Sequence, residues 1–311
     1  MKLPSAIAWS SNTKMHPKKL HLHLLQSLTV PRQFSESRLQ EAAVGLFNNI
    51  STKSGLKKAL KKKLIYLNGK IASTADFVRG GEKLELFQDT TSATKAQIDL
   101  PVEVLFEDDH LAFVYKPSGI TVSGNKKWTL ENALQKALGP SSQFDALTRP
   151  EPIHRLDHPT SGVLLIGKTS TAVIALNQLF ETRKIEKTYL AVVIGEISPS
   201  GSLENKIDGK DAKTSFVLSD RIASPRFGFL NLVTLQLETG RKHQIRKHLS
   251  EMGNPILGDR LYGKETMILK GKGLYLHASY LAFVHPVTKE NLRVSAKVPK
   301  KFLKLFPNKT A

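Results

Sequence analysis

From about residue 100 onward, apolar residues recur along the chain with two different periods. Runs rich in β-branched and aromatic residues predict strands at 102–106, 111–115, 163–166, 188–194 and 230–237. Apolar residues at helical spacing predict helices at 128–138, 171–180 and 242–252. Strands outnumber helices and alternate with them irregularly. We therefore expect an α/β or α+β domain built on one large mixed sheet.

Residues 35–88 predict a smaller unit ahead of this domain. Apolar spacing predicts a helix at 38–47, and a second helix that starts near Ser51 or Thr52, either of which can cap it. A strand at 64–67 ends in Asn68-Gly69, which is a strong hairpin signal. Gly80-Gly81 predicts a further turn before the apolar run 84–87. The segment thus combines two helices with short strands.

The second of these helices separates apolar from basic residues. Leu56, Leu60 and Leu64 recur at every fourth position and share one face. Lysines occupy the opposite side, namely Lys57, Lys58, Lys61 and Lys62. Such a face is usually only solvated surface. Beside a hairpin in a strongly basic chain, however, it favours contact with phosphates.

Composition limits the classes of function. The chain has 311 residues, a net charge of +19 and no cysteine. The charge points to a polyanionic partner, most simply nucleic acid, with a merely soluble basic protein as the alternative. The lack of cysteine excludes disulfides and thiolate chemistry. No run of 18 apolar residues predicts a transmembrane helix, and we expect no membrane partner.

The ends of these units divide the chain into four parts. Residues 1–34 contain no acidic residue, and we expect a disordered basic extension. Residues 35–88 form the small unit, 89–100 a polar linker, and 101–305 the large domain. The extension has lysines but little arginine, which argues against an organelle transit peptide. We expect a cytoplasmic protein.

The run His-Arg-Leu-Asp-His-Pro-Thr-Ser-Gly at residues 154–162 is the strongest candidate for chemistry. Asp157 lies on a loop that leads directly into the apolar strand 163–166. A loop fixed by a central strand is a common place for catalytic side chains. Taken alone, the run also fits an acid that caps its own turn.

The helix predicted at 242–252 carries a second group of polar candidates. Ile245, Leu249 and Met252 should face the core, which leaves Arg246 toward the other side. His243 and His248 suggest a metal site, but a spacing of five residues does not align them on a helix. We therefore expect no metal.

The small unit resembles the S4 RNA-binding domain in the segment TKSGLKKALKKKLIYLNGKIASTADFVRGGEKLEL. The likeness lies in the lysine-rich helix, the LNGK turn and the GGEKLEL strand. It implies phosphate contacts by the four lysines named above.

The large domain resembles the RluA-type pseudouridine synthases over roughly residues 101–300. The matching segments, in the family's order, are IHRLDHPTSGVLLIGKT, IEKTYLAVVIGE, LETGRKHQIRKHLSEMGNPILGDRLYG and LHASYLAFVHP. Tyr115, Ser123 and Asn254 depart from the residues usual in the family. The resemblance implies an α+β fold with a large, mainly antiparallel sheet and flanking helices.

The resemblance also implies an activity and the residues that carry it. Pseudouridine formation breaks the uridine N1–C1′ bond, turns the base and rejoins it through C5, without redox change, so we expect no cofactor. Asp157 matches the catalytic carboxylate, either as a nucleophile or as the base that forms a glycal. Arg246 matches the cation expected to pair with it, and Tyr189 the active-site tyrosine. Locally, Tyr189 also fits an ordinary strand residue, and Arg246 a surface cation.

Target uridines in folded RNA must be flipped out before they reach Asp157. Arg155 is placed to fill the vacated stack, although a salt bridge that holds the loop is the plainer interpretation. Lys187 lies on the same strand face as Tyr189 and either holds a flanking phosphate or is solvated. The full set of predicted substrate contacts is His154, Arg155, Lys116, Lys187 and Ile245.

These residues favour an RNA pseudouridine synthase over the rival classes. A non-catalytic S4-type assembly protein does not need Asp157, Tyr189 and Arg246 together. The sequence has no glycine-rich loop of the kind that a kinase needs. A glycosidase needs a second carboxylate beside Asp157, and Glu238 stays open as that residue. We expect large-subunit ribosomal RNA as the first substrate choice, transfer RNA as the second, and a monomer.

Overall fold

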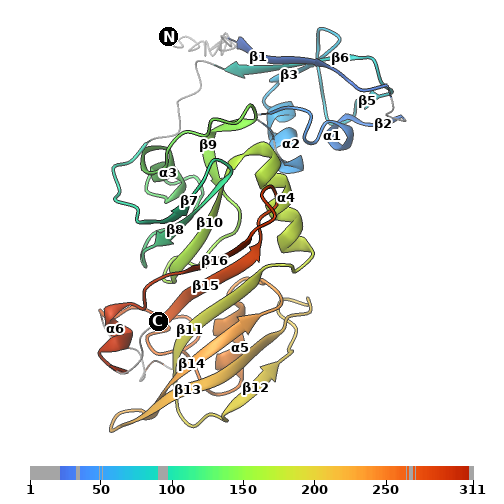
Figure 1. Cartoon of the computed structure of the whole chain (residues 1–311). Coiled ribbons are helices and arrows are strands. Elements are labelled where there is room, and N and C mark those ends of the chain that lie inside the picture. Colours follow the sequence, from blue (N-terminus) through green and yellow to red (C-terminus); the bar gives the residue numbers. More distant parts are fainter. Residues whose placement is uncertain are drawn as a thin grey trace, which may run out of the picture. The chain divides into compact units, whose positions relative to one another are not determined.

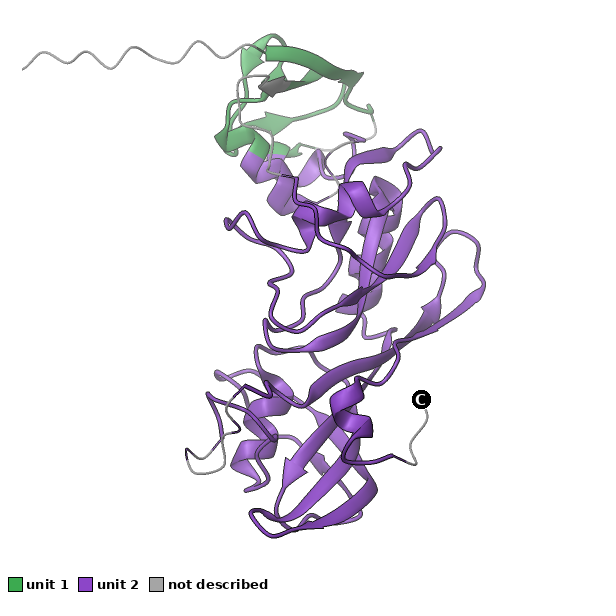
Figure 2. Ribbon diagram, turned by 90° about the vertical axis from the view of Figure 1, so that its left-hand side faces the viewer, with its two compact units in different colours: residues 1–39, 59–94 green, residues 40–58, 95–311 purple. Residues whose placement is uncertain are grey.

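The chain forms two compact units in a computed structural model that describes residues 22–32, 36–48, 50, 52–89, 97–263, 265, 269 and 271–307. Unit 1 comprises residues 1–39 and 59–94, and unit 2 comprises residues 40–58 and 95–311 (Figure 2). The division differs from the predicted boundary, because residues 40–58 belong to the large unit. Gly45 lies beside the Ile174 side chain, and the Asn48 carbonyl accepts a hydrogen bond from the Ser170 hydroxyl.

Unit 1 contains a four-stranded sheet and a short two-stranded one. The larger sheet has the order β1-β6-β3-β4, from β1 (Leu22–Thr29), β6 (Lys83–Asp89), β3 (Ile65–Leu67) and β4 (Lys70–Ile71). The smaller sheet pairs β2 (Ser37–Arg38) with β5 (Phe77–Val78). Asn68 and Gly69 have positive φ angles of 48° and 78°, and they form the predicted turn between β3 and β4.

Part of the predicted disordered extension is a strand. β1 pairs antiparallel with β6, from Leu22 opposite Asp89 to Thr29 opposite Lys83. The prediction of disorder for residues 22–29 was therefore wrong. Most of the β1 side chains are exposed, so the strand carries little hydrophobic signal, and its order comes from backbone pairing with β6. Residues 1–21 of the extension and 90–96 of the linker lie outside the described residues.

The two predicted early helices are α1 (Leu39–Ala42) and α2 (Lys53–Lys61). The Thr52 hydroxyl accepts a hydrogen bond from the Gly55 N–H at 3.0 Å and caps α2, as predicted. Leu56 and Leu60 are buried, whereas the four predicted RNA-contacting lysines are exposed. The amphipathic division of α2 is therefore confirmed.

Unit 2 is built on a large sheet with the strand order β12-β13-β14-β11-β15-β10-β8-β7 (Figure 1). β16 pairs with β15, and β9 pairs with β10. In the described part of this sheet every pair is antiparallel except β10 with β15. The predicted α+β class with a mainly antiparallel sheet is confirmed. The strand bounds are β7 Val104–Glu107, β8 Leu111–Lys116, β9 Ala146–Pro152, β10 Ser161–Thr169, β11 Glu186–Ile194, β12 Ser200–Leu203, β13 Thr214–Ser224, β14 Gly228–Leu237, β15 Leu276–Val284 and β16 Asn291–Ser295.

Helices pack on both faces of the large sheet at its central strand, β10. Val163 and Leu165 of β10 pack with α4 (Ser170–Glu181), whereas Leu164 and Ile166 pack with residues around α3 (Glu131–Ala137). Both faces of β10 are therefore buried, as its continuous apolar run predicted. α5 (Gln244–Glu251) packs through two apolar residues against β11 and β14, and α6 (Lys300–Leu303) follows the last strand. No helix among the described residues has the length and apolar character needed to cross a bilayer.

Gly162 fixes the start of β10 at the centre of the sheet. It pairs with Lys116 of β8 on one side and Ala278 of β15 on the other, with φ +125°. A Cβ atom at this position would lie 2.0 Å from the Ala278 carbonyl oxygen. Only glycine fits so close an approach of two backbones. The loop before it, residues 153–160, is thereby held at one place on the sheet.

Candidate active site

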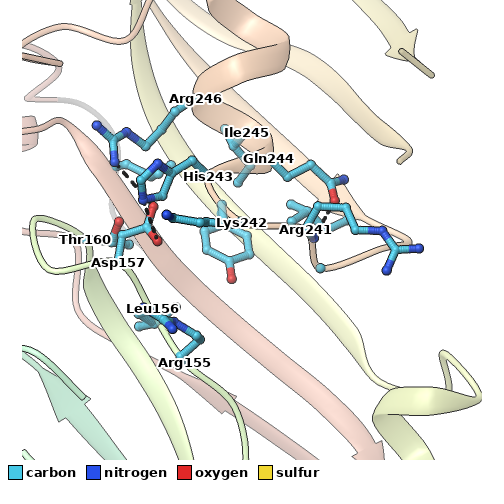
Figure 3. Close-up of a pocket in the computed structure, with 14 residues that line it drawn as sticks. Arg155, Leu156, Asp157, Thr160, Arg241, Lys242, His243, Gln244, Ile245 and Arg246 are labelled. Carbon is cyan, nitrogen blue, oxygen red and sulfur yellow. Dashed lines mark hydrogen bonds and ion pairs between the residues drawn. The ribbon is translucent and has the colours of Figure 1, made fainter. Parts of the chain in front are cut away.

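Asp157 lies on the loop 153–160 and lines a cavity of about 200 Å³. The Asp157 carbonyl accepts a hydrogen bond from the Thr160 N–H at 3.0 Å, which closes the turn. Tyr189 of β11 and residues 240–246 at the start of α5 form the other walls. Figure 3 shows the Asp157 side chain pointing toward the start of α5, whereas Arg155 extends away from it. The loop therefore presents its acid to the cavity.

Arg246 of α5 lies next to the Asp157 carboxylate. Its Nη1 is 3.5 Å from Asp157 Oδ2, and its Nε and Nη2 donate to the two oxygens of Asp259 at 2.7 and 2.8 Å. The Arg246 and Asp259 side chains are only 6% and 1% exposed, and Asp157 is 18% exposed. A buried carboxylate thus fixes the guanidinium with one edge directed at Asp157. Among the described residues, the Asp157 carboxylate pairs with Arg246 and His243 and makes no capping bond to its own turn.

The Asp259 carboxylate is held ionised beneath Arg246. Burial alone would raise the pKa of Asp259, but the Arg246 hydrogen bonds and charge keep it below its ordinary value, helped by the N–H groups of Leu261 and Tyr262. Burial opposes the charge of Arg246 in turn, yet Asp259 and then Asp157 raise the pKa of Arg246. The arginine is therefore a permanent cation beside Asp157.

His243 is a second group at Asp157. Its backbone adopts φ 57°, in the left-handed region that residues other than glycine rarely occupy. Its Nε2 is 3.6 Å from Asp157 Oδ1, and its Nδ1 is 2.8 Å from the Tyr262 hydroxyl. Burial lowers the pKa of His243. Asp157 opposes this shift, and the neighbouring cations, with Arg246 first, add to it. The ring is therefore mainly neutral near pH 7, and its Nε2 lies beside Asp157 at a distance slightly too long for a hydrogen bond.

Tyr189 lines the same cavity from the middle of the sheet. It lies on β11 opposite Leu235 of β14 and Ala278 of β15. Burial raises the pKa of Tyr189 well above its usual range, and the negative charge of Asp157 adds to the effect. The phenol therefore keeps its proton, which leaves an O–H group and an aromatic ring available to a bound base.

Lys116 has a different place from the one predicted. It is fully buried, and its Nζ donates to the carbonyl oxygens of Thr160 at 2.6 Å, Pro117 at 3.0 Å and His158 at 3.3 Å. Burial lowers the pKa of Lys116 to about 8, although Asp157 opposes the shift. The predicted substrate contact of Lys116 was therefore wrong, because its three protons are used by backbone carbonyls, two of which belong to the loop. Lys116 positions the loop that carries Asp157.

The other predicted substrate contacts divide between two adjacent cavities. Arg155 is exposed and borders both of them, whereas Ile245 is buried in the wall of the first. His154 and Lys187 line the second. Nε2 of His154 accepts a hydrogen bond from the Leu165 N–H at 3.1 Å, and burial lowers the pKa of His154 to about 4. That ring is neutral and anchors the loop to β10.

Asp259, Tyr262 and the role of His243 were missed by sequence reasoning. Asp259 and Tyr262 lie in the matched segment NPILGDRLYG, which was the available signal. His243 was considered only as a metal ligand together with His248. The His248 ring instead bonds to Thr214 Oγ1 at 3.0 Å and to the Asn205 carbonyl at 2.9 Å. No group of three or more potential ligands among the described residues could hold a metal ion.

Comparison with known proteins agrees with the geometry of this site. Residues 110–251 match the RNA pseudouridylate synthase family, a range that includes Asp157, Tyr189 and Arg246. The chain is 34% identical to ribosomal large subunit pseudouridine synthase D of Xanthomonas campestris pv. campestris, over 91% of this chain and 92% of that protein. It is 30% identical to an uncharacterized RNA pseudouridine synthase of Aquifex aeolicus, over 87% and 93% of the two chains.

Solved structures agree on the fold. The human RNA pseudouridylate synthase domain containing 1 protein superimposes with a TM-score of 0.53 at 23% identity, over 63% of this chain and 83% of that one. The protein belongs to the RNA pseudouridine synthase family, and within it to the RluA type. It is an isomerase that acts on RNA, as the resemblance implied.

Proposed function

We propose that the protein converts uridines of large-subunit ribosomal RNA to pseudouridine. The supporting observation is the Asp157 carboxylate in an open cavity, 3.5 Å from an arginine that a buried acid holds in place. The relatives named as acting on the large ribosomal subunit align over about nine-tenths of the chain. The exposed lysine face of α2, with Lys57, Lys58, Lys61 and Lys62, supplies phosphate contacts in this proposal, as an S4-like unit would. The cytoplasmic location and the monomeric state expected from the sequence stay predictions.

In the proposed reaction Asp157 acts as the catalytic carboxylate. Both routes, attack by Asp157 or removal of a ribose proton, begin from the ionised acid. Arg246 and the neutral His243 place a fixed cation and a polar ring beside its two oxygens. The ring of Tyr189 stacks on the flipped base. Its hydroxyl can give its proton to N1 once C5 has replaced that atom at C1′, and can then take up the proton that C5 loses. Arg155 fills the space that the flipped nucleotide leaves.

Site mapping tests the substrate directly. The purified protein is incubated with a transcript of large-subunit ribosomal RNA and, separately, with a pool of unmodified transfer RNA. Pseudouridines are then located by carbodiimide labelling and reverse transcription. The proposal expects discrete sites in the ribosomal RNA and none in transfer RNA. Sites confined to transfer RNA would leave the enzyme class intact and overturn the proposed substrate.

A further inference from the structure

A second cavity, of about 430 Å³, lies beside the one that holds Asp157. Five residues line both cavities, namely Arg155, Tyr189, Leu237, Gly240 and Arg241. Basic residues dominate the lining, which includes Arg155, Arg183, Lys187 and Arg241. Glu181 and Glu238 are its acids, and Glu238 lies 3.4 Å from the ammonium of Lys213. A strongly basic cavity thus continues from the catalytic one.

Lys187 is the unusual member of this lining, because it is only 9% exposed. Within the described residues its ammonium makes no hydrogen bond and no ion pair, and its one polar contact is with the face of the Phe180 ring, 5.8 Å away. Burial lowers the pKa of Lys187, and the charge of Arg183 lowers it further. The neighbouring His154 ring is neutral, so it does not serve as the counter-charge of Lys187. Buried cations in proteins are normally paired, so this one lacks the anion that its surroundings call for.

Two arginines complete the arrangement around Lys187. Arg183 follows the end of α4, where its N–H donates to the Phe180 carbonyl at 3.2 Å and its φ is 58°. Its guanidinium has no carboxylate partner in the described part of the chain. Arg241 borders both cavities, and its Nε donates to the Asp211 carbonyl at 3.0 Å. A backbone carbonyl therefore holds the Arg241 side chain, whereas the Arg183 guanidinium is left to bind an anion.

We propose that this cavity binds one backbone phosphate of the RNA, beside the nucleotide that enters the catalytic cavity. Lys187 and Arg183 contact the phosphate, with Arg241 at the border between the two cavities. The inference rests on the proposed function, because it takes the strand that delivers the uridine to continue into the adjacent space. A phosphodiester is ionised at any pH near neutrality and so supplies the missing negative charge. Arginine can donate two hydrogen bonds to two of its oxygens at once.

Single neutral linkages test this assignment. RNA oligonucleotides that carry the mapped target uridine are made with one methylphosphonate, placed in turn at each linkage on either side of it. For the native protein, one position should lower kcat/KM about tenfold, the usual size of one charge-assisted contact. Lys187→Gln should lower kcat/KM on the all-phosphate RNA and should lose clearly less than the native protein at that position, because only the Arg183 contact is left to remove. Lys187→Arg should keep the native pattern.

Matched variants separate this contact from general charge effects. Lys184→Gln removes an exposed cation one residue from Arg183 and should behave like the native protein. Arg183→Gln should lose sensitivity at the same linkage as Lys187→Gln. Thermal unfolding provides an independent readout, because Lys187→Met removes an unpaired buried charge and should raise the midpoint.

Three results would overturn the phosphate contact. The first is an equal loss of kcat/KM at every methylphosphonate linkage. The second is a Lys187 or Arg183 variant whose loss adds in full to the loss caused by the methylphosphonate. The third is a lower unfolding midpoint for Lys187→Met. If Lys187→Gln did not fold, Arg183→Gln alone would decide the coupling, since its side chain is exposed. A native protein that forms no pseudouridine in any ribosomal RNA would instead refute the proposed function.

Discussion

Asp259→Asn removes one negative charge from beneath Arg246 while nearly keeping the shape of the side chain. Asp259 holds Arg246 through two hydrogen bonds of 2.7 and 2.8 Å, between groups that are almost fully buried. The asparagine oxygen can still accept from the N–H groups of Leu261 and Tyr262. Its amide then faces the Arg246 Nε–H, donor against donor, and leaves a buried cation without its counter-charge.

The expected loss of stability follows from this burial. Breaking one side of a buried pair costs about 3–5 kcal/mol, so the free energy of unfolding should fall by that amount near neutral pH. The control is Asp208→Asn. Asp208 is the exposed partner of Lys247 on α5, so this change should cost far less stability than Asp259→Asn. The measurement is urea unfolding of both variants beside the native protein.

Acidification gives the same reasoning a second test. The pKa of Asp259 is held below its unfolded value, which is about 3.9. The contribution of Asp259 to the free energy of unfolding is therefore complete above that pH and disappears as the pH falls through the folded pKa. The stabilities of the native protein and Asp259→Asn should therefore converge in strong acid. Single-turnover conversion by the variant should also fall, on the order of 100-fold, because Arg246 loses its orientation toward Asp157. A stability loss equal to that of Asp208→Asn, or an unchanged rate, would refute this role of Asp259.

Three further predictions concern other parts of the protein. Arg246→Ala should reduce single-turnover conversion far more than Lys247→Ala, because Arg246 contacts Asp157 and Lys247 contacts Asp208; equal losses would remove Arg246 from the site. Tyr189→Phe should keep RNA affinity and lose conversion. Because burial raises the pKa of Tyr189, the pH–rate profile of the native protein should show no tyrosine ionisation up to about pH 10. A drop in rate below pH 10 that Tyr189→Phe abolishes would contradict this. Neutralising the α2 face should make the slope of log affinity against log salt shallower by about 3, whereas an unchanged slope would show that the face does not contact the RNA. The fourfold glutamine variant for that titration carries the changes at Lys57, Lys58, Lys61 and Lys62.

The elements that could be predicted are those with a continuous apolar pattern. β10 is buried on both faces, and its sequence contains an uninterrupted apolar run. In α4 and α5 the apolar residues recur at helical spacing. The helix expected at 38–47 ends at Ala42, before Gly45 with its φ of +80°. β1 and β12 were missed because their side chains are mostly exposed or half-buried, and such strands depend on backbone pairing that no local pattern reveals.

Local pattern singled out only Asp157 in the site, whereas Tyr189 and Arg246 were assigned through the family resemblance. Asp157 was visible because a strand of strong pattern fixes its loop. The burial of Arg246 was not, because the helix pattern placed it away from the core, and Asp259 from a later loop covers it. The position of His243 depends on a left-handed backbone that histidine rarely adopts, so no propensity indicates it. Lys116 was misassigned because its partners are carbonyl oxygens, which sequence does not distinguish.

Tritium release from RNA labelled at C5 of uridine tests the central claim most directly. Formation of pseudouridine replaces the C5 hydrogen, so each product formed releases one tritium to water. The native protein should release tritium from large-subunit ribosomal RNA in proportion to the sites mapped. Asp157→Asn should release none above background while binding the same RNA with nearly native affinity. Release by Asp157→Asn within tenfold of the native rate would contradict the assignment of Asp157 as the catalytic carboxylate.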